Sequence, residues 1–127
     1  MTLAIGTDIL EIARLQKVYE RQGHKLVKRI LTPTELARYE AIEDETVRMQ
    51  FLAKRWCAKE AIAKALGTGI AKGVGWQNIQ VGNLPSGAPA VRLYDAAQVR
   101  LEKLGGHKVL ISLSDERHYC VAFCTII

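Results

Sequence analysis

Two carboxylates that lie far apart in the sequence are the residues of this chain best suited to chemistry. Glu60 lies inside a mostly apolar helical segment, and Asp8 interrupts the apolar run that opens the chain. A carboxylate among apolar neighbours is costly to bury unless it is paired, hydrogen-bonded or bound to a metal. Two partners for Glu60 are open: Lys64 one helical turn further on, or a metal ion held jointly with Asp8.

Basic side chains accompany the acid on the same helix. At roughly 100° per residue, Arg48, Arg55 and Lys59 lie close to one line, about a third of a turn from Glu60. A phosphate-rich ligand could follow this stripe while Mg²⁺ neutralises the rest of its charge. The ordinary alternative is a solvated basic face beside a helix pair at i, i+4, and periodicity alone favours that alternative.

The residues around these groups predict an α+β fold, with mixed helices and a mainly antiparallel sheet around one long central helix, in a single domain over 1–127. The central helix runs from Glu45 to Leu66 and ends at Gly67. We expect strands at 1–12, 76–81, 90–93, 109–113 and 119–127, and further helices at 13–21, 25–31, 33–42 and from Tyr94 or Asp95 to Leu104. Thr32 and Pro33 supply an N-cap and first-turn signal.

Composition narrows the partner to something negatively charged. The 127 residues carry a formal charge of +5, and with 49% hydrophobic and 24% charged residues the chain is an ordinary globular one. Only 6% of residues are aromatic, and no strand combines an aromatic pair with flanking basic residues, so we expect no nucleic acid as a partner.

No apolar run is long enough to span a bilayer, and the three cysteines form no CxxC pair. We therefore expect no membrane partner, buried reduced thiols and a cytoplasmic location.

Three motifs together resemble one family. They are Gly6-Thr7-Asp8-Ile9, Arg55-Trp56-Cys57-Ala58-Lys59-Glu60-Ala61 followed by Lys64 and Gly67-Thr68-Gly69-Ile70, and Ser112-Leu113-Ser114-Asp115-Glu116. In order, spacing and total length they resemble the holo-[acyl-carrier-protein] synthases, the small bacterial type of the 4'-phosphopantetheinyl transferase superfamily. The resemblance covers essentially the whole chain.

The resemblance implies a Mg²⁺-dependent transferase of fatty acid biosynthesis. Such enzymes move the 4'-phosphopantetheine arm of coenzyme A onto a serine of apo-acyl carrier protein and release adenosine 3',5'-bisphosphate. The family is typically a homotrimer with active sites between protomers. Rival interpretations are a small RNA-binding module, a metal-dependent nucleotide hydrolase that uses the same acids and lysines, and a trimeric scaffold without activity.

Site residues follow by motif matching. Asp8 and Glu60 would be the metal ligands and, with Lys64, the catalytic residues; the general base stays open. The coenzyme A site would include Arg55, Lys59, Lys64, Gly67, Thr68, Gly69 and the loop from Ser86 to Pro89. Acyl carrier protein would dock on the basic first helix through Arg14, Arg21 and Gln22. The alternative is that these residues are the solvated face of an amphipathic helix. Asp115, where many members have histidine, is expected to cap its turn rather than act on a ligand.

Overall fold

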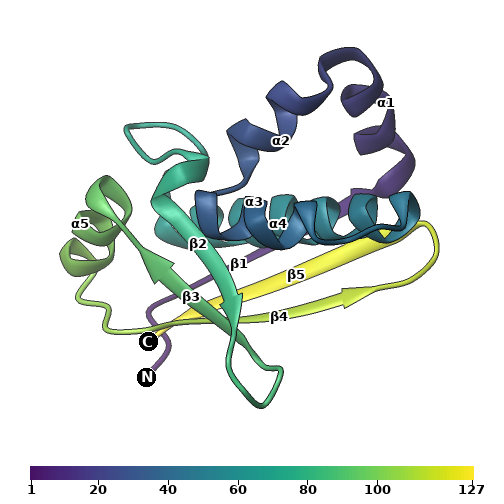
Figure 1. Cartoon of the computed structure of the whole chain (residues 1–127). Helices are drawn as coiled ribbons and strands as arrows, with labels where there is room; N and C mark the ends of the chain where they lie inside the picture. Colours follow the sequence, from purple (N-terminus) through teal and green to yellow (C-terminus); the bar gives the residue numbers. More distant parts are fainter.

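The computed structural model describes all residues from 1 to 127 and confirms the α+β class. Figure 1 shows α4 lying across a three-stranded sheet, with α1 and α2 arching above it and α5 at one end. In chain order the elements are β1 (Ala4–Glu11), α1 (Ile12–Gln22), α2 (His24–Ile30), α3 (Pro33–Glu40), α4 (Glu45–Leu66), a 3-10 turn (Trp76–Asn78), β2 (Ile79–Asn83), β3 (Pro89–Leu93), α5 (Asp95–Lys103), β4 (Val109–Asp115) and β5 (Tyr119–Ile126). The long central helix therefore has the predicted bounds.

Both sheets are antiparallel. The larger has the order β1-β5-β4, with Asp8 opposite Ala122 and Ile9 opposite Val121, and the smaller is the β2–β3 hairpin. Because side chains alternate along a strand, the larger sheet has two different faces. One face packs against α4 and buries small residues of β5, such as Ala122; the other face is open.

The helix α4 is apolar on most of its circumference because it is the centre of the core. The sheet covers one side, and α1, α2, α3 and β2 cover others. A helix that is apolar all round is buried, which explains why its sequence shows no single wet face. Asp44 caps its first turn by accepting a hydrogen bond from the Val47 amide at 2.9 Å, and Gly67 ends it in the left-handed conformation, with φ of 81°.

Gly6 sets the distance between β1 and α4. A Cβ atom at this position would lie 2.1 Å from the Ala61 carbonyl oxygen and 2.7 Å from the Ala65 amide nitrogen. Both obstacles are backbone atoms of the helix, so no side-chain rotation can relieve the clash. The glycine of the Gly6-Thr7-Asp8 motif is therefore a packing requirement, and it brings Asp8 up to α4.

We predict that Gly6→Ala destabilises the fold by at least about 2 kcal/mol, because β1 must move off the helix. The measurement is the free energy of unfolding from urea denaturation. Gly82→Ala is the matched control, because a Cβ on Gly82 meets nothing within 4 Å. Equal stability of the two variants would contradict the close-packing role of Gly6.

Two details differ from the sequence prediction. The segment from Trp76 to Asn78 is a 3-10 turn, and the strand begins only at Ile79. The turn is held by side chains: the Asn78 carboxamide accepts from the Gly75 amide at 2.8 Å, and Gln77 donates to carbonyl groups at the end of α2. Such side-chain contacts compete with strand pairing.

Two other sequence expectations, on Thr32 and on the cysteines, are confirmed. Thr32 caps α3 in a reciprocal capping box with Glu35. The three cysteines are buried free thiols. None of the helices has the length and apolar character needed to cross a membrane.

Candidate active site

The predicted acid Asp8 lies on the helix-facing side of β1 and is paired with a lysine. Its carboxylate lies 2.9 Å from the Lys64 ammonium group, which also donates to the Thr7 carbonyl oxygen at 3.0 Å. Lys64 therefore bridges to the strand rather than pairing with Glu60 along the helix. It stays half exposed, with 51% of its side chain accessible, so a bound anion can still reach it.

Glu60 lies beside this pair. Burial is the main cause that raises its pKa, and the charge of Asp8 raises it further, whereas Lys64 lowers it. The structure thus brings Asp8 and Glu60, 52 positions apart in the sequence, within electrostatic reach of each other. Lys64 pairs with Asp8, and Glu60 adds a second carboxylate beside the pair, which leaves an excess of negative charge that a cation would neutralise.

The donor set fits a hard divalent ion. No group of three or more His, Cys, Asp or Glu side chains is gathered anywhere in the chain, so protein atoms alone do not build a closed metal cage. Mg²⁺ usually takes only one or two protein carboxylates and completes its shell with water and substrate phosphates. Asp8 and Glu60 would supply two such carboxylates.

A basic cleft of about 510 Å³ begins one turn beyond Lys64. Gly67 and Thr68 form one side, as the motif predicted, whereas Gly69 does not line it. Three basic residues that the motifs do not include, Lys72, Arg100 and Lys103, line it together with the apolar residues Val74, Ala96 and Val99. Arg100 is held in place because its Nε donates to the Leu66 carbonyl oxygen at 2.8 Å. Their only sequence signal was the basic pair Arg100 and Lys103, one turn apart on α5.

The basic stripe predicted along α4 does not act as one surface. Arg48 donates to the Glu40 and Ile42 carbonyl oxygens and so closes the end of α3. Lys59 is fully buried, and its ammonium group donates to Glu35 at 2.7 Å, to the Ile30 carbonyl at 2.6 Å and to the Trp76 carbonyl at 3.0 Å. Three donors meet three acceptors, so the expectation that Lys59 lines a bound anion is wrong: it has no donor left.

Arg55 is the member of the stripe that keeps free hydrogen-bonding capacity. It is only 5% exposed, its guanidinium group lies 4.4 Å from the centre of the Phe51 ring, and its Nε has no hydrogen-bond partner. Burial lowers the pKa of Arg55 to about 10, and Glu35 acts in the opposite direction. A buried guanidinium without an anion is a costly arrangement that a phosphate would relieve.

The two groups of predicted residues occupy opposite sides of α4. Nine positions separate Arg55 from Lys64, which at 100° per residue places them roughly 180° apart. Pro89 lies on neither side of α4: it begins β3 and lines a separate groove on the hairpin sheet together with His107. One chain therefore does not direct all the predicted coenzyme A residues at one point.

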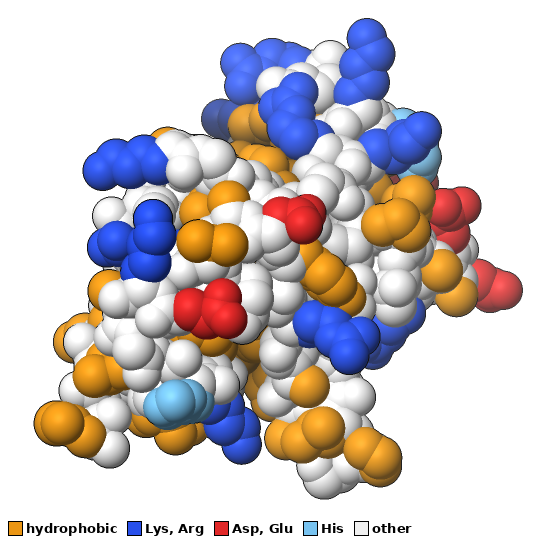
Figure 2. Space-filling view, turned by 90° about the vertical axis from the view of Figure 1, so that its left-hand side faces the viewer, with side chains coloured by type: hydrophobic (Ala, Val, Ile, Leu, Met, Phe, Trp, Pro, Cys, Tyr) orange, Lys and Arg blue, Asp and Glu red, His pale blue; other side chains and the backbone are white.

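The basic helix α1 is open to solvent. Arg14, Arg21 and Gln22 are exposed, and a shallow cleft of about 650 Å³ runs past Arg14, Lys17 and Arg21. Figure 2 shows Lys and Arg side chains over the top of the molecule, at the height of α1 and α2 in Figure 1.

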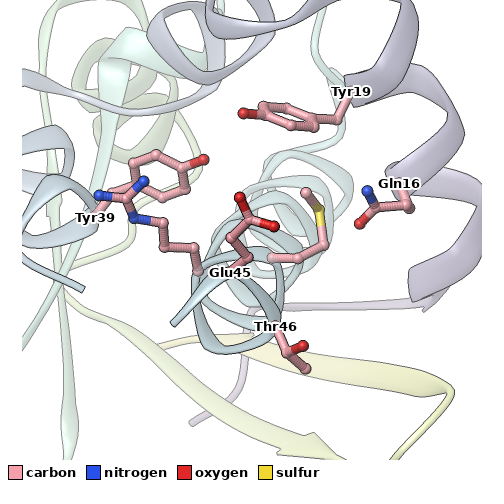
Figure 3. Close-up of a pocket in the computed structure, with 7 residues that line it drawn as sticks. Gln16, Tyr19, Tyr39, Glu45 and Thr46 are labelled. Carbon is pink, nitrogen blue, oxygen red and sulfur yellow. The ribbon is translucent and has the colours of Figure 1, made fainter. Parts of the chain in front are cut away.

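Beneath α1 lies a smaller cavity of about 260 Å³ between α1, α3 and α4. The hydroxyl groups of Tyr19 and Tyr39 face it, with the Glu45 carboxylate between them (Figure 3). Burial, then the neighbouring Tyr19, raises the pKa of Tyr39 to about 12. The cavity contains none of the predicted site residues.

Asp115 does not cap its turn, contrary to expectation. It is the last residue of β4 and lies 3.8 Å from the Lys54 ammonium group. The cap is the next residue: the Glu116 carboxylate accepts from the backbone amides of His118 at 2.8 Å and Tyr119 at 3.1 Å. A longer side chain reaches the two amides across the turn.

Fold and site together define a small α+β enzyme of the phosphoryl-transfer type, and comparison with known proteins agrees. The model of the 4'-phosphopantetheinyl transferase superfamily matches residues 4–124. The holo-[acyl-carrier-protein] synthase of Shewanella frigidimarina is 52% identical over 120 residues, covering 94% of this chain and 93% of the relative. The chain belongs to the holo-[acyl-carrier-protein] synthase family, and it is an enzyme of the phosphopantetheinyl transferase class.

Solved structures extend the likeness to three dimensions. The crystal structure of holo-[acyl-carrier-protein] synthase from Neisseria meningitidis has a TM-score of 0.91 at 37% identity, covering 100% of this chain and 99% of that one. The Bacillus anthracis protein, solved in complex with coenzyme A (3',5'-ADP), has a TM-score of 0.83 at 32% identity, covering 99% and 96%.

Proposed function

We propose that this chain transfers the 4'-phosphopantetheine arm of coenzyme A to a serine of apo-acyl carrier protein, with Mg²⁺ bound by Asp8 and Glu60. The proposal rests chiefly on the two acids and Lys64 converging beside a basic cleft. The serine oxygen attacks the phosphorus that bears the pantetheine arm. The bond to the bridging oxygen breaks, and adenosine 3',5'-bisphosphate leaves.

The proposed site residues have two kinds of role, which are charge neutralisation and positioning of the substrate. Bound Mg²⁺ would supply charge neutralisation across the diphosphate. Lys64 is exposed enough to contact a phosphate oxygen and is held by Asp8 and the Thr7 carbonyl. Glu60, whose pKa is raised by burial, is a candidate acceptor for the serine proton, directly or through water, besides its role as ligand.

The opposed directions of Arg55 and Lys64 support a homotrimer with sites between protomers. A ligand that touches Lys64 and Gly67 of one chain reaches an Arg55 and a Pro89 only if a neighbouring chain supplies them. The open sheet face supports the same assembly, because Ile5, Ile9, Leu110, Tyr119, Val121 and Phe123 are each between 38% and 65% exposed on it. Monomeric proteins seldom leave such a face uncovered.

The biological setting follows from the reaction. We place the enzyme in the cytoplasm and in fatty acid biosynthesis, where the holo-carrier would be used. Three buried free thiols without a disulfide fit a reducing compartment.

The test of function is the intact mass of apo-acyl carrier protein after incubation with the enzyme, coenzyme A and Mg²⁺. We expect the mass of one phosphopantetheine group to be added, and no addition when Mg²⁺ is chelated. A carrier that a second transferase modifies but this chain leaves unchanged would overturn the assignment. Release of nucleotide without any carrier would instead favour a hydrolase.

Carrier docking on α1 gives a separate prediction. Arg14→Glu places a negative charge on a helix that we expect to meet an acidic protein, so the KM for the carrier should rise about tenfold. The KM for coenzyme A should stay unchanged, and the defect should shrink as salt screens the contact. Steady-state kinetics at two salt concentrations measure both. Arg117→Glu in the turn between β4 and β5 is the control for a charge reversal elsewhere, because Arg117 is exposed and lines none of the clefts described above. Equal damage to both KM values by Arg14→Glu would refute carrier docking at this helix.

A further inference from the structure

A fully buried ion pair lies on the Arg55 side of α4. The Glu35 carboxylate is 1% exposed and accepts three hydrogen bonds: from the Thr32 amide at 2.8 Å, the Lys59 ammonium at 2.7 Å and the Val81 amide at 2.7 Å. The Lys59 ammonium group donates its other two hydrogen bonds to backbone carbonyl groups. Each partner is satisfied, and the pair is electrically neutral.

Arg55 lies one helical turn before Lys59 on the same side of the helix. Glu35 is the acid whose charge acts on Arg55, yet no ion pair or hydrogen bond joins them. With Lys59 present, the three side chains carry a net charge of +1, and that charge belongs to a guanidinium group without a partner. Without the Lys59 charge, Glu35 would be a buried unpaired anion within electrostatic reach of the buried Arg55, and such an anion is strongly driven to pair.

We propose that Lys59 is a positioning residue for the transfer reaction: by saturating Glu35, it prevents that carboxylate from closing onto Arg55 and keeps the guanidinium free for a phosphate of coenzyme A. The inference rests on the proposed function, because it takes Arg55 as a coenzyme A residue. It also explains why a lysine with no exposed atom stands next to the metal-binding Glu60 in the sequence motif. Lys59 contributes to anion binding through the charge that it removes from Glu35.

The experiment measures the dissociation constant of adenosine 3',5'-bisphosphate by calorimetry, with kcat and KM for coenzyme A alongside. Lys59→Met leaves Glu35 free to capture Arg55, so binding of the probe should weaken about tenfold or more while kcat at saturating coenzyme A changes less than about threefold. The double variant Glu35→Gln with Lys59→Met removes the competing charge as well. It should bind the probe within about threefold of the wild-type chain.

A merely structural Lys59 predicts a different pattern. Loss of the buried pair would then shift the midpoint of thermal unfolding but leave the affinity of the folded protein for the probe unchanged. That result, or a double variant that binds no better than Lys59→Met, overturns the inference. If Lys59→Met does not fold, Lys59→Gln replaces it, since the amide still donates to a backbone carbonyl but carries no charge.

Arg55→Met separates this inference from the proposed function. It should weaken probe binding by itself, and adding Lys59→Met should then cause no further loss, because no guanidinium remains to be captured. If Arg55→Met leaves affinity intact, the assignment of Arg55 to the coenzyme A site fails and the inference fails with it. If Arg55→Met weakens binding but Lys59→Met does not, only the role given to Lys59 fails.

Discussion

Glu60→Gln is expected to lower kcat by roughly 100-fold or more while leaving the chain folded. The substitution keeps the shape of the side chain but removes one of the two charges that we assign to Mg²⁺. Activity of the residual enzyme should require a higher Mg²⁺ concentration than the wild type. A Mg²⁺ titration of carrier modification, read by intact mass, measures both effects.

The stability of Glu60→Gln, unlike its kcat, should not fall. The pKa of Glu60 is raised in the folded chain, chiefly by burial and then by Asp8, so the ionised form opposes folding at pH values above the unfolded-state pKa. Glutamine removes that charge, and in metal-free buffer at pH 7 the variant should be at least as stable as the wild type. The exposed acid Glu43 provides a matched control, since Glu43→Gln should change neither kcat nor the Mg²⁺ requirement. A large loss of stability in Glu60→Gln would assign the defect to folding instead of chemistry.

The sequence predicted the two acids and the central helix because their signals are local or strong. A mostly apolar segment of 22 residues that is followed by a glycine predicts α4 well. Asp8 was predicted from a break in an apolar run together with the motif, and Gly6 beside it brings the strand close enough for its carboxylate to reach Lys64.

The role of Lys59 was missed because its partners come from other elements. Helical periodicity places Lys59 on one line with Arg55, but it does not reveal that Glu35 of α3, 24 positions away, lies against that line. The same limit explains Arg48, whose acceptors are carbonyl groups at the end of α3. Periodicity predicts on which side of the helix a side chain lies. Whether that side meets solvent, a ligand or the core depends on the neighbouring elements, which periodicity does not reveal.

The organisation of α4 links the site to assembly. Its Glu60 and Lys64 side serves the proposed metal centre, its Arg55 side serves an anion, and roughly 180° separates them. In the proposed homotrimer, the two groups that act on one coenzyme A molecule come from neighbouring chains. Assembly would therefore be part of the catalytic mechanism, and a change far from either group should abolish activity if it separates the protomers.

Phe123→Asp is a substitution that should separate the protomers while lying far from both groups. Phe123 lies on the open face of β5, 46% exposed, directly between Thr7 of β1 and Ser112 of β4. An aspartate here costs little in a monomer, but it would place an unpaired charge inside an interface, where burial is strongly unfavourable. We expect a monomer by sedimentation velocity, with an unchanged far-UV circular dichroism spectrum and a loss of carrier modification of at least about 100-fold.

Val47→Asp in the first turn of α4 controls for the loss of an exposed apolar side chain, because Val47 is 47% exposed but lies off the sheet face and does not line the basic cleft. That variant should keep both the assembly and the activity of the wild type. A shared site requires that the two losses occur together: dissociation and inactivity should appear over the same range of protein concentration. A fully active monomer, whether of Phe123→Asp or of the wild-type chain, would mean that one protomer closes the site alone, and the opposed sides of α4 would need another explanation.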